Sequence, residues 1–156
     1  MSQFDPKIQV RASHVAHSIL QVDVPSYALR DQLQVSLGIQ LNWRDAGQPD
    51  HYVIIGTLQV RGHTPDGSSA FLAEATMHQV SEVMGFEGEE LAEVLAVRLP
   101  GILLPYLRAQ LASTLVAAGY HHVTLPASLN HEGLRATELV LPVPTAAAVA
   151  EQETAP

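Results

Sequence analysis

Cysteine is absent from this chain of 156 residues, which excludes disulfide bonds and thiolate chemistry. Charged residues are scarce at 15%, and aromatic residues account for only 5%. No apolar run reaches the roughly 18 residues from which a membrane-spanning helix is recognised, and residues 1–6 lack the basic start and apolar stretch of a signal peptide. We therefore expect a cytoplasmic protein that does not span a membrane.

The motifs of common enzyme classes are missing too. The sequence contains no Gly-x-Ser-x-Gly, no phosphate-binding loop and no dinucleotide fingerprint. The acidic residues Glu87, Glu89, Glu90 and Glu93 could supply a general acid, but acids also favour the first turn of a solvated helix, and this is the simpler interpretation. We therefore predict that the protein is not an enzyme.

Eight histidines raise the question of a metal site. His121 and His122 are adjacent, and His14 and His17 are three positions apart, so both pairs would point to opposite faces of a regular strand. There is no cysteine beside them and no His-Glu-x-x-His motif. We expect ordinary surface histidines, with neither a metal nor another cofactor.

The charge balance narrows the class of partner. The net charge is −8, whereas binding to phosphate backbones needs clustered lysine and arginine, so nucleic acid is not expected as a partner. Basic segments of other proteins would be attracted instead. Hydrophobic residues make up 47% of the chain. So much apolar surface with so little charge indicates an oligomer interface or an exposed apolar binding surface.

The first half of the chain alternates between apolar and polar residues. Residues 33–43, 52–60 and 71–77 each show the period of two that is typical of a strand with one buried face. Residues 7–24 are less regular and predict one or two further strands. The segment 25–30 is too long for a tight hairpin, which suggests a crossover between strands that are not neighbours. The apolar residues of the first segment that share one parity are Ile8, Val10, Ala12, Leu20, Val22 and Val24.

The period becomes helical after Phe86. One helix is expected up to Leu99, where Pro100-Gly101 should break it, and a second from about residue 102 to 118. The predicted fold is α+β: a four-stranded antiparallel sheet with a crossover loop, followed by packed helices. Arg108 is the only charged residue of the second helix, and a helix apolar on most sides usually packs against another subunit. The residues assigned to this oligomer interface are Ile102, Leu103, Tyr106, Leu107, Arg108, Leu111 and Leu115.

The chain is expected to form one domain, residues 1–141. Residues 130–141 are a weak candidate for a further helix, stopped by Pro142 and Pro144. The remaining residues, 142–156, are rich in proline and alanine and are expected to be disordered.

Several blocks of the sequence resemble the SecB family of bacterial export chaperones. The most specific is Pro-x-Ile-Leu-x-Pro-Tyr-x-Arg, from Pro100 to Arg108, which places two prolines, a tyrosine and an arginine at fixed spacing before an amphipathic helix. The resemblance covers roughly residues 8–134. The other blocks that carry it are Phe71-Leu72-Ala73-Glu74, Gly85-Phe86-Glu87-Gly88, Gly119 and Leu125-Pro126.

This resemblance implies a homotetramer, a dimer of dimers, that holds unfolded preproteins without ATP and passes them to the SecA motor. Long apolar grooves would bury exposed segments of the client, and no cofactor would be needed. By the resemblance, Asp23, Leu72 and Glu74 match positions that dock the motor, whereas Ile19 stands where typical members carry an acid.

The departures from the family leave alternatives open. Typical members end in a long second helix, whereas residues 130–141 are only a weak helix candidate here. This departure and Ile19 resemble the solitary SecB-like chaperones that guard the antitoxin of a toxin–antitoxin pair. A self-assembling subunit without chaperone activity is another hypothesis. A small-ligand-binding or catalytic role has no motif in its favour.

Overall fold

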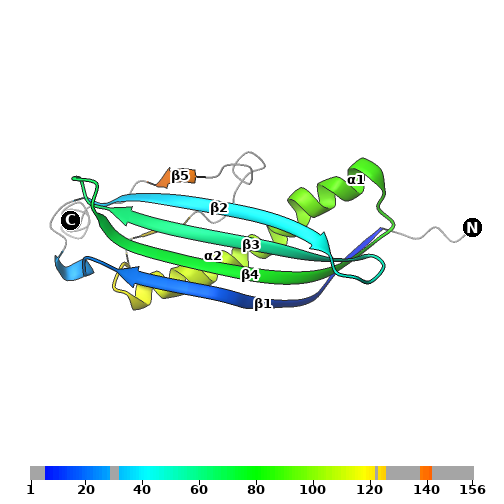
Figure 1. The fold of residues 1–156 in the computed structure, drawn as a ribbon, viewed down its shortest axis with the longest axis horizontal. Helices are drawn as coiled ribbons and strands as arrows, with labels where there is room; N and C mark the ends of the chain where they lie inside the picture. Colours follow the sequence, from blue (N-terminus) through cyan, green and yellow to red (C-terminus); the bar gives the residue numbers. More distant parts are fainter. Residues whose placement is uncertain (1–5, 29–31, 122, 126–137, 142–156) are drawn as a thin grey trace, which may run out of the picture.

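The computed structural model describes residues 6–28, 32–121, 123–125 and 138–141. A single antiparallel sheet dominates it, with the strand order β1-β4-β3-β2-β5 (Figure 1). The sheet is therefore of the predicted type, with one short additional strand. Its strands are β1 (Lys7–Val22), β2 (Gln34–Asp45), β3 (His51–His63), β4 (Ser69–Met84) and β5 (Glu138–Leu141).

The chain crosses the sheet between β1 and β2. β1 pairs with β4 at one edge, while β2 lies on the far side of β3, so the two strands are not neighbours. This confirms the crossover predicted from residues 25–30, part of which forms the short 3₁₀ turn η1 (Ser26–Ala28). β5 corrects the weak helix prediction for residues 130–141, because its four residues pair with Val35–Gly38 of β2. Residues 130–137 and the predicted disordered tail lie outside the described residues.

The helical part is continuous from α1 (Gly88–Glu93) through the π-helical turn η2 (Val94–Arg98) to α2 (Leu99–Ala117). The predicted break at Pro100-Gly101 is therefore wrong. Pro100 is the second residue of α2, and the chain is helical on both sides of it. A π-helical turn directly precedes α2, so the regular α-helical hydrogen bonding is already altered where the N–H of Pro100 is missing. α2 ends, as predicted, ahead of Gly119, which adopts a φ of 86°.

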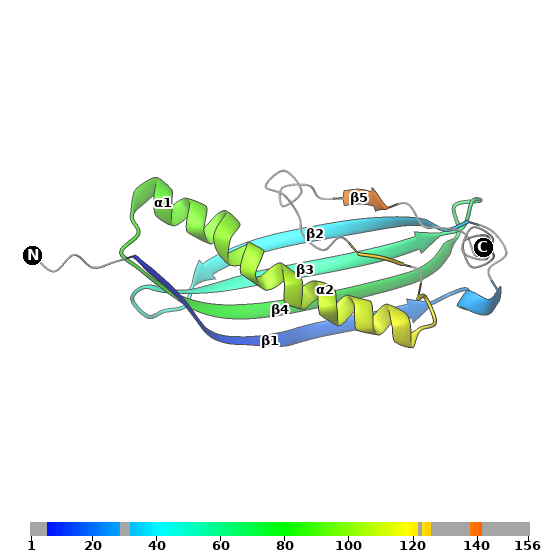
Figure 2. The ribbon, with the colours of Figure 1, turned by 180° about the vertical axis from the view of Figure 1, so that it is seen from behind.

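The core lies between α2 and one face of the sheet. α2 runs diagonally across that face and packs on β3 and β4 (Figure 2). The alternation predicted for the strands is confirmed, since Leu37, Ile54 and Phe71 are fully buried on the helix side. Gly56 lets the helix approach, because a Cβ atom there would lie 2.8 Å from Cδ2 of Leu103.

β1 is one long strand with two β-bulges. Its register against β4 shifts between Val10 and Ala12 and again between Val15 and His17. Each extra residue reverses the side on which the following side chains project. Ala12 consequently pairs with Val80 on the face away from α2, so the parity that it shares with Val10 does not place the two residues on the same face. After the second shift, Leu20 and Val22 return to the helix side, opposite Ala73 and Phe71.

Candidate functional site

The helix side of β1 is left partly uncovered. α2 packs mainly on β3 and β4, and only its C-terminal end reaches the edge of the sheet at β1 (Figure 2), so in the described part of the chain the apolar residues of β1 that project to this side are covered only in part. Val10, Val15, Leu20 and Val22 each keep between 40% and 43% of their surface exposed. A row of aliphatic side chains along an edge strand is a surface that proteins normally cover.

The outer side of α2 adds to this surface. Ile102, Tyr106 and Val116 are 37%, 57% and 51% exposed, and their spacing of four and ten residues keeps them on one side of the helix. Arg108 is the only charged residue of α2. We call the four β1 residues and these three α2 residues the uncovered helix-side surface.

Four of the seven residues expected at an oligomer interface need correction, and all four are leucines of α2. Leu103, Leu107, Leu111 and Leu115 are at most 1% exposed, because they form the stripe of α2 that packs on the protomer's own sheet. They are core residues and do not present their side chains to a partner.

The remaining residues of the expected interface behave differently. Ile102 and Tyr106 stay exposed in the protomer. Arg108 is half-buried, and its Nε donates a hydrogen bond of 3.2 Å to the carbonyl oxygen of Leu125. It therefore ties the segment after α2 to the helix within one protomer.

The outward face of the sheet carries the residues assigned to motor docking. Leu72 lies opposite Gln21, and Glu74 lies opposite Ile19, so both share this face with the end of β1. Asp23 is exposed two residues beyond Gln21 and accepts hydrogen bonds from Ser69 Oγ at 2.6 Å and Gln21 Nε2 at 2.9 Å. The bond from Ser69, and then that from Gln21, lower the pKa of Asp23. The three predicted residues thus lie along one stretch of the β1–β4 pair.

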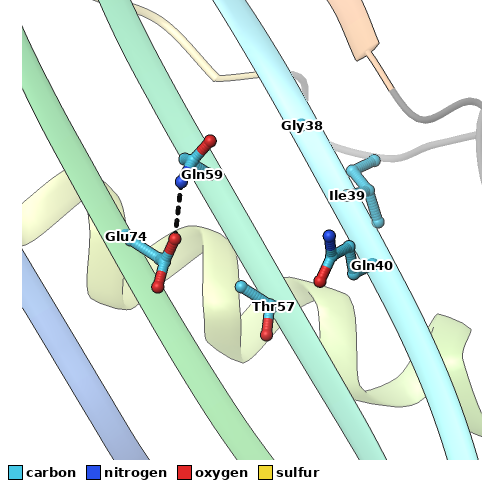
Figure 3. A pocket seen from close by; sticks show the side chains of 6 residues that line it. All are labelled: Gly38, Ile39, Gln40, Thr57, Gln59 and Glu74. Carbon is cyan, nitrogen blue, oxygen red and sulfur yellow. Dashed lines mark hydrogen bonds between the residues drawn. The ribbon is translucent and has the colours of Figure 1, made fainter.

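Glu74 belongs to a network of polar side chains across the sheet. Gln59 Nε2 donates a 2.6 Å hydrogen bond to Glu74 Oε2 (Figure 3). His17 Nε2 lies 3.6 Å from Glu74 Oε1. A shallow hollow of about 150 Å³ adjoins this carboxylate; its other lining residues include Gln40 and Thr57. Hydrogen bonding fixes the carboxylate here, so this part of the face is rigid and polar.

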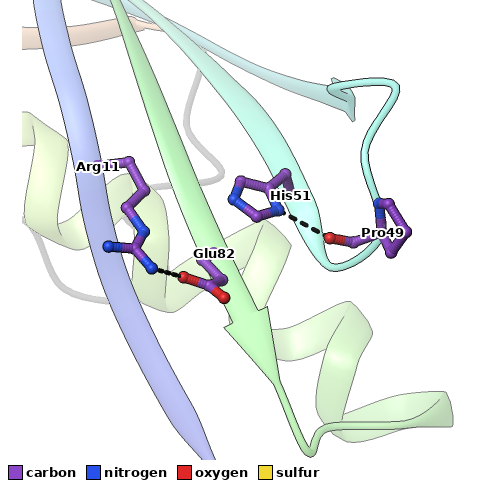
Figure 4. Close-up of polar contacts among 4 residues, drawn as sticks. All are labelled: Arg11, Pro49, His51 and Glu82. Carbon is purple, nitrogen blue, oxygen red and sulfur yellow. Dashed lines mark hydrogen bonds and ion pairs between the residues drawn. The ribbon is translucent and has the colours of Figure 1, made fainter.

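The opposite end of the outward face is also held by polar contacts. Arg11 of β1 forms an ion pair with Glu82 of β4, and His51 Nδ1 donates a 2.7 Å hydrogen bond to the carbonyl oxygen of Pro49 (Figure 4). Both contacts are exposed. The first connects the edge strand β1 to β4, and the second stabilises the turn that precedes β3. They form no constellation suited to proton transfer.

An apolar hollow of about 200 Å³ lies between β2 and the helical segment. Trp43 is half exposed there and makes an edge-to-face contact with Tyr52, with ring centres 6.1 Å apart. Sequence reasoning missed this site, although a tryptophan ending an alternating strand was a signal for it. The hollow is lined by Leu41, Asn42, Trp43, Leu95, Ala96 and Pro100.

The edge of β2 beside this hollow is open. β5 pairs only with Val35–Gly38, so within the described ranges residues 39–45 have no strand on that side. Their outward N–H and C=O groups can therefore pair with an added strand. An extended peptide could bond to this edge and place alternate side chains in the hollow.

In the described part of the chain, no group of three or more histidine, aspartate or glutamate side chains is arranged to hold a metal ion. None of the helices described is long and apolar enough to cross a membrane.

The family model for SecB, described as preprotein translocase subunit SecB, matches residues 3–139. The chain belongs to the SecB family. Among its relatives, the protein-export protein SecB of Saccharophagus degradans is 32% identical over 121 residues, which cover 74% of this chain and 70% of the relative. That of Chromobacterium violaceum is 27% identical over 135 residues, covering 85% and 87%. The predicted family and its chaperone class are thereby confirmed.

The fold of this SecB-family chain has a solved counterpart. A SecB-like chaperone of Mycobacterium tuberculosis, in complex with a ChAD peptide from the HigA1 antitoxin, superposes with a TM-score of 0.63. The two sequences are 17% identical, and the match covers 76% of this chain and 88% of the other. This likeness confirms the predicted SecB-like fold.

Proposed function

We propose that this SecB-family chaperone is an ATP-independent holdase of the cytoplasm that binds unfolded preproteins, with no catalytic step. The observation that carries the proposal is the pairing of the apolar hollow at Trp43 with the open edge of β2. The edge offers main-chain hydrogen bonds that any sequence can use, while the hollow favours apolar side chains. A site of this kind selects for extended, hydrophobic segments, which folded proteins do not expose.

The same proposal includes assembly into a homotetramer, a dimer of dimers. The uncovered helix-side surface holds seven apolar residues, each partly exposed in the protomer. Burying a large aliphatic side chain completely contributes about 1.5–3 kcal/mol. Each of these side chains would therefore stabilise the contact with a second copy that covers this surface. β1 is also an edge strand, and its free side offers backbone groups to a partner.

Delivery to the SecA motor is the further step that we propose, with Asp23, Leu72 and Glu74 as the docking residues. They lie on the face of the sheet away from the uncovered helix-side surface, so assembly through that surface would leave them accessible. Two carboxylates beside a half-buried leucine suit a basic segment with an apolar residue. Ile19, opposite Glu74, contributes no charge, and docking weaker than in typical members is expected.

A chaperone dedicated to an antitoxin is the alternative that a specific observation favours. Ile19 removes a carboxylate from the proposed docking patch, and the solved counterpart of the fold carries an antitoxin peptide. In this case the client would still be an extended peptide at the hollow, but the motor would not be a partner. Titration with the basic tail of SecA at low salt separates the two, since Glu74→Lys should abolish binding only if docking occurs there.

The holdase proposal is tested by aggregation of an unfolded client. With one tetramer per client and no nucleotide, the protein should suppress turbidity. If it leaves turbidity unchanged while remaining a tetramer, a self-assembling subunit without chaperone activity becomes the better account.

A further inference from the structure

The second β-bulge of β1 changes how the histidines are arranged. In a regular strand His14 and His17 would point to opposite faces, which was the expectation from the sequence. The register shift between Val15 and His17 places both on the outward face, where His14 pairs with His78 and His17 with Thr76. That expectation is therefore wrong, and three histidines share one area of the sheet.

His14 and His78 are direct cross-strand partners. Their ring centres are 5.3 Å apart and the ring planes are inclined at 70°. In the described part of the chain, neither ring takes part in a hydrogen bond or ion pair with another side chain. His17 is different, because its Nε2 lies 3.6 Å from the carboxylate of Glu74. In the described part of the chain, the imidazole rings of His14 and His78 thus lie side by side, and no other side chain engages their nitrogens.

This spacing suits a shared metal ion. Because a Zn–N bond measures about 2.0–2.1 Å, the centre of a bound imidazole lies about 3.2 Å from the ion, and two such rings at a tetrahedral angle have centres about 5.2 Å apart. The observed separation is 5.3 Å. On the same face, His78 also pairs with Ile55 of β3, and its neighbours along β4 are Thr76 and Val80.

We propose that His14 and His78 form a site for a divalent transition-metal ion that prefers imidazole, such as Zn²⁺. Two strands supply one ligand each, and water completes the coordination. A bound ion would fasten the edge strand β1 to β4 between its two bulges, where the ladder is interrupted. The site is independent of the client hollow and of the proposed docking residues.

The experiment is a calorimetric titration of the tag-free full chain with ZnCl₂. We expect one ion per protomer with a dissociation constant in the micromolar range. His14→Gln and His78→Gln should each weaken binding by at least about tenfold. His51→Gln is the matched control: it removes another histidine of the outward face, whose Nδ1 is already engaged by Pro49, and should leave binding unchanged.

Electron paramagnetic resonance of the Cu²⁺-loaded protein supplies a second readout, in which two nitrogen ligands should be reduced to one by either substitution. Circular dichroism checks that the variants are folded. Absence of zinc binding overturns the proposal. So does binding that survives both substitutions, or binding that disappears when His121 and His122 are replaced instead.

Discussion

Leu20 and Ile19 offer a sharp test of assembly through the uncovered helix-side surface. They are adjacent in β1 and similarly exposed, at 41% and 37%, but Leu20 projects to the helix side and Ile19 to the outward face. Leu20→Asp should therefore dissociate the oligomer, while Ile19→Asp should not. The matched pair controls for the effect of a charge on strand stability.

The magnitude follows from the exposure of Leu20. Complete burial of a leucine is worth about 1.5–3 kcal/mol, so the 41% still exposed corresponds to about 0.6–1.2 kcal/mol per copy. An unpaired carboxylate in the interface adds a desolvation penalty of several kcal/mol per ion. A two-fold interface contains the change twice. Because about 1.4 kcal/mol is a factor of ten, the dissociation constant should rise by at least about a hundredfold.

Light scattering and sedimentation velocity across a dilution series measure this constant. The expected pattern is smaller species for Leu20→Asp at concentrations where Ile19→Asp and the natural sequence remain tetrameric. Assembly through the uncovered helix-side surface is refuted if Leu20→Asp assembles as tightly as the natural sequence. Equal dissociation of both variants would also refute it, because the effect would then not depend on the face of the sheet to which the side chain projects.

Three further outcomes are expected. Trp43→Ala should weaken client binding by about tenfold or more in a peptide titration, with assembly unchanged, because it removes the aromatic wall of the hollow. Gly56→Val should lower the free energy of unfolding in urea by about 1–3 kcal/mol, because the added carbons meet Leu103; an unchanged midpoint would contradict the packing. Hydrogen bonds from Thr64 and then Ser68 lower the pKa of Asp66 from 3.8 to about 2. A carboxyl with a lowered pKa stabilises the fold above pH 3.8 and loses this effect as the pH falls to about 2. The melting temperature of the Asp66→Asn variant should therefore depend less on pH between about 2 and 3.8 than that of the natural sequence.

Much of the fold could be predicted because it depends on local periodicity. The alternation from Leu33 to Trp43 fixed which side of β2 is buried, and the irregular linker at residues 25–30 indicated the crossover. The outward placement of Leu72 and Glu74 followed from the same parity. Each of these depends only on the order of apolar and polar residues along a strand.

The errors arise where tertiary structure overrides that pattern. A bulge adds one residue without a composition signal, so the faces of Ala12 and His17 could not be assigned by counting. The spacing of the leucines in α2 is equally typical of a core and of an oligomer interface. Only the position of the sheet shows that Leu103 belongs to the core. The break expected at Pro100 does not occur, because the chain stays helical through a π-helical turn just before it. The hollow at Trp43 joins elements some fifty residues apart in the chain, which no local pattern records.

The fluorescence of Trp43 tests the holdase account most directly. It is the only tryptophan in the chain and it lines the proposed client hollow, so its emission reports on that site alone. Adding an unfolded client that lacks tryptophan, without nucleotide, should shift the emission to shorter wavelength and protect it from a soluble quencher. An unchanged spectrum under conditions where the client is bound would contradict the placement of clients in this hollow.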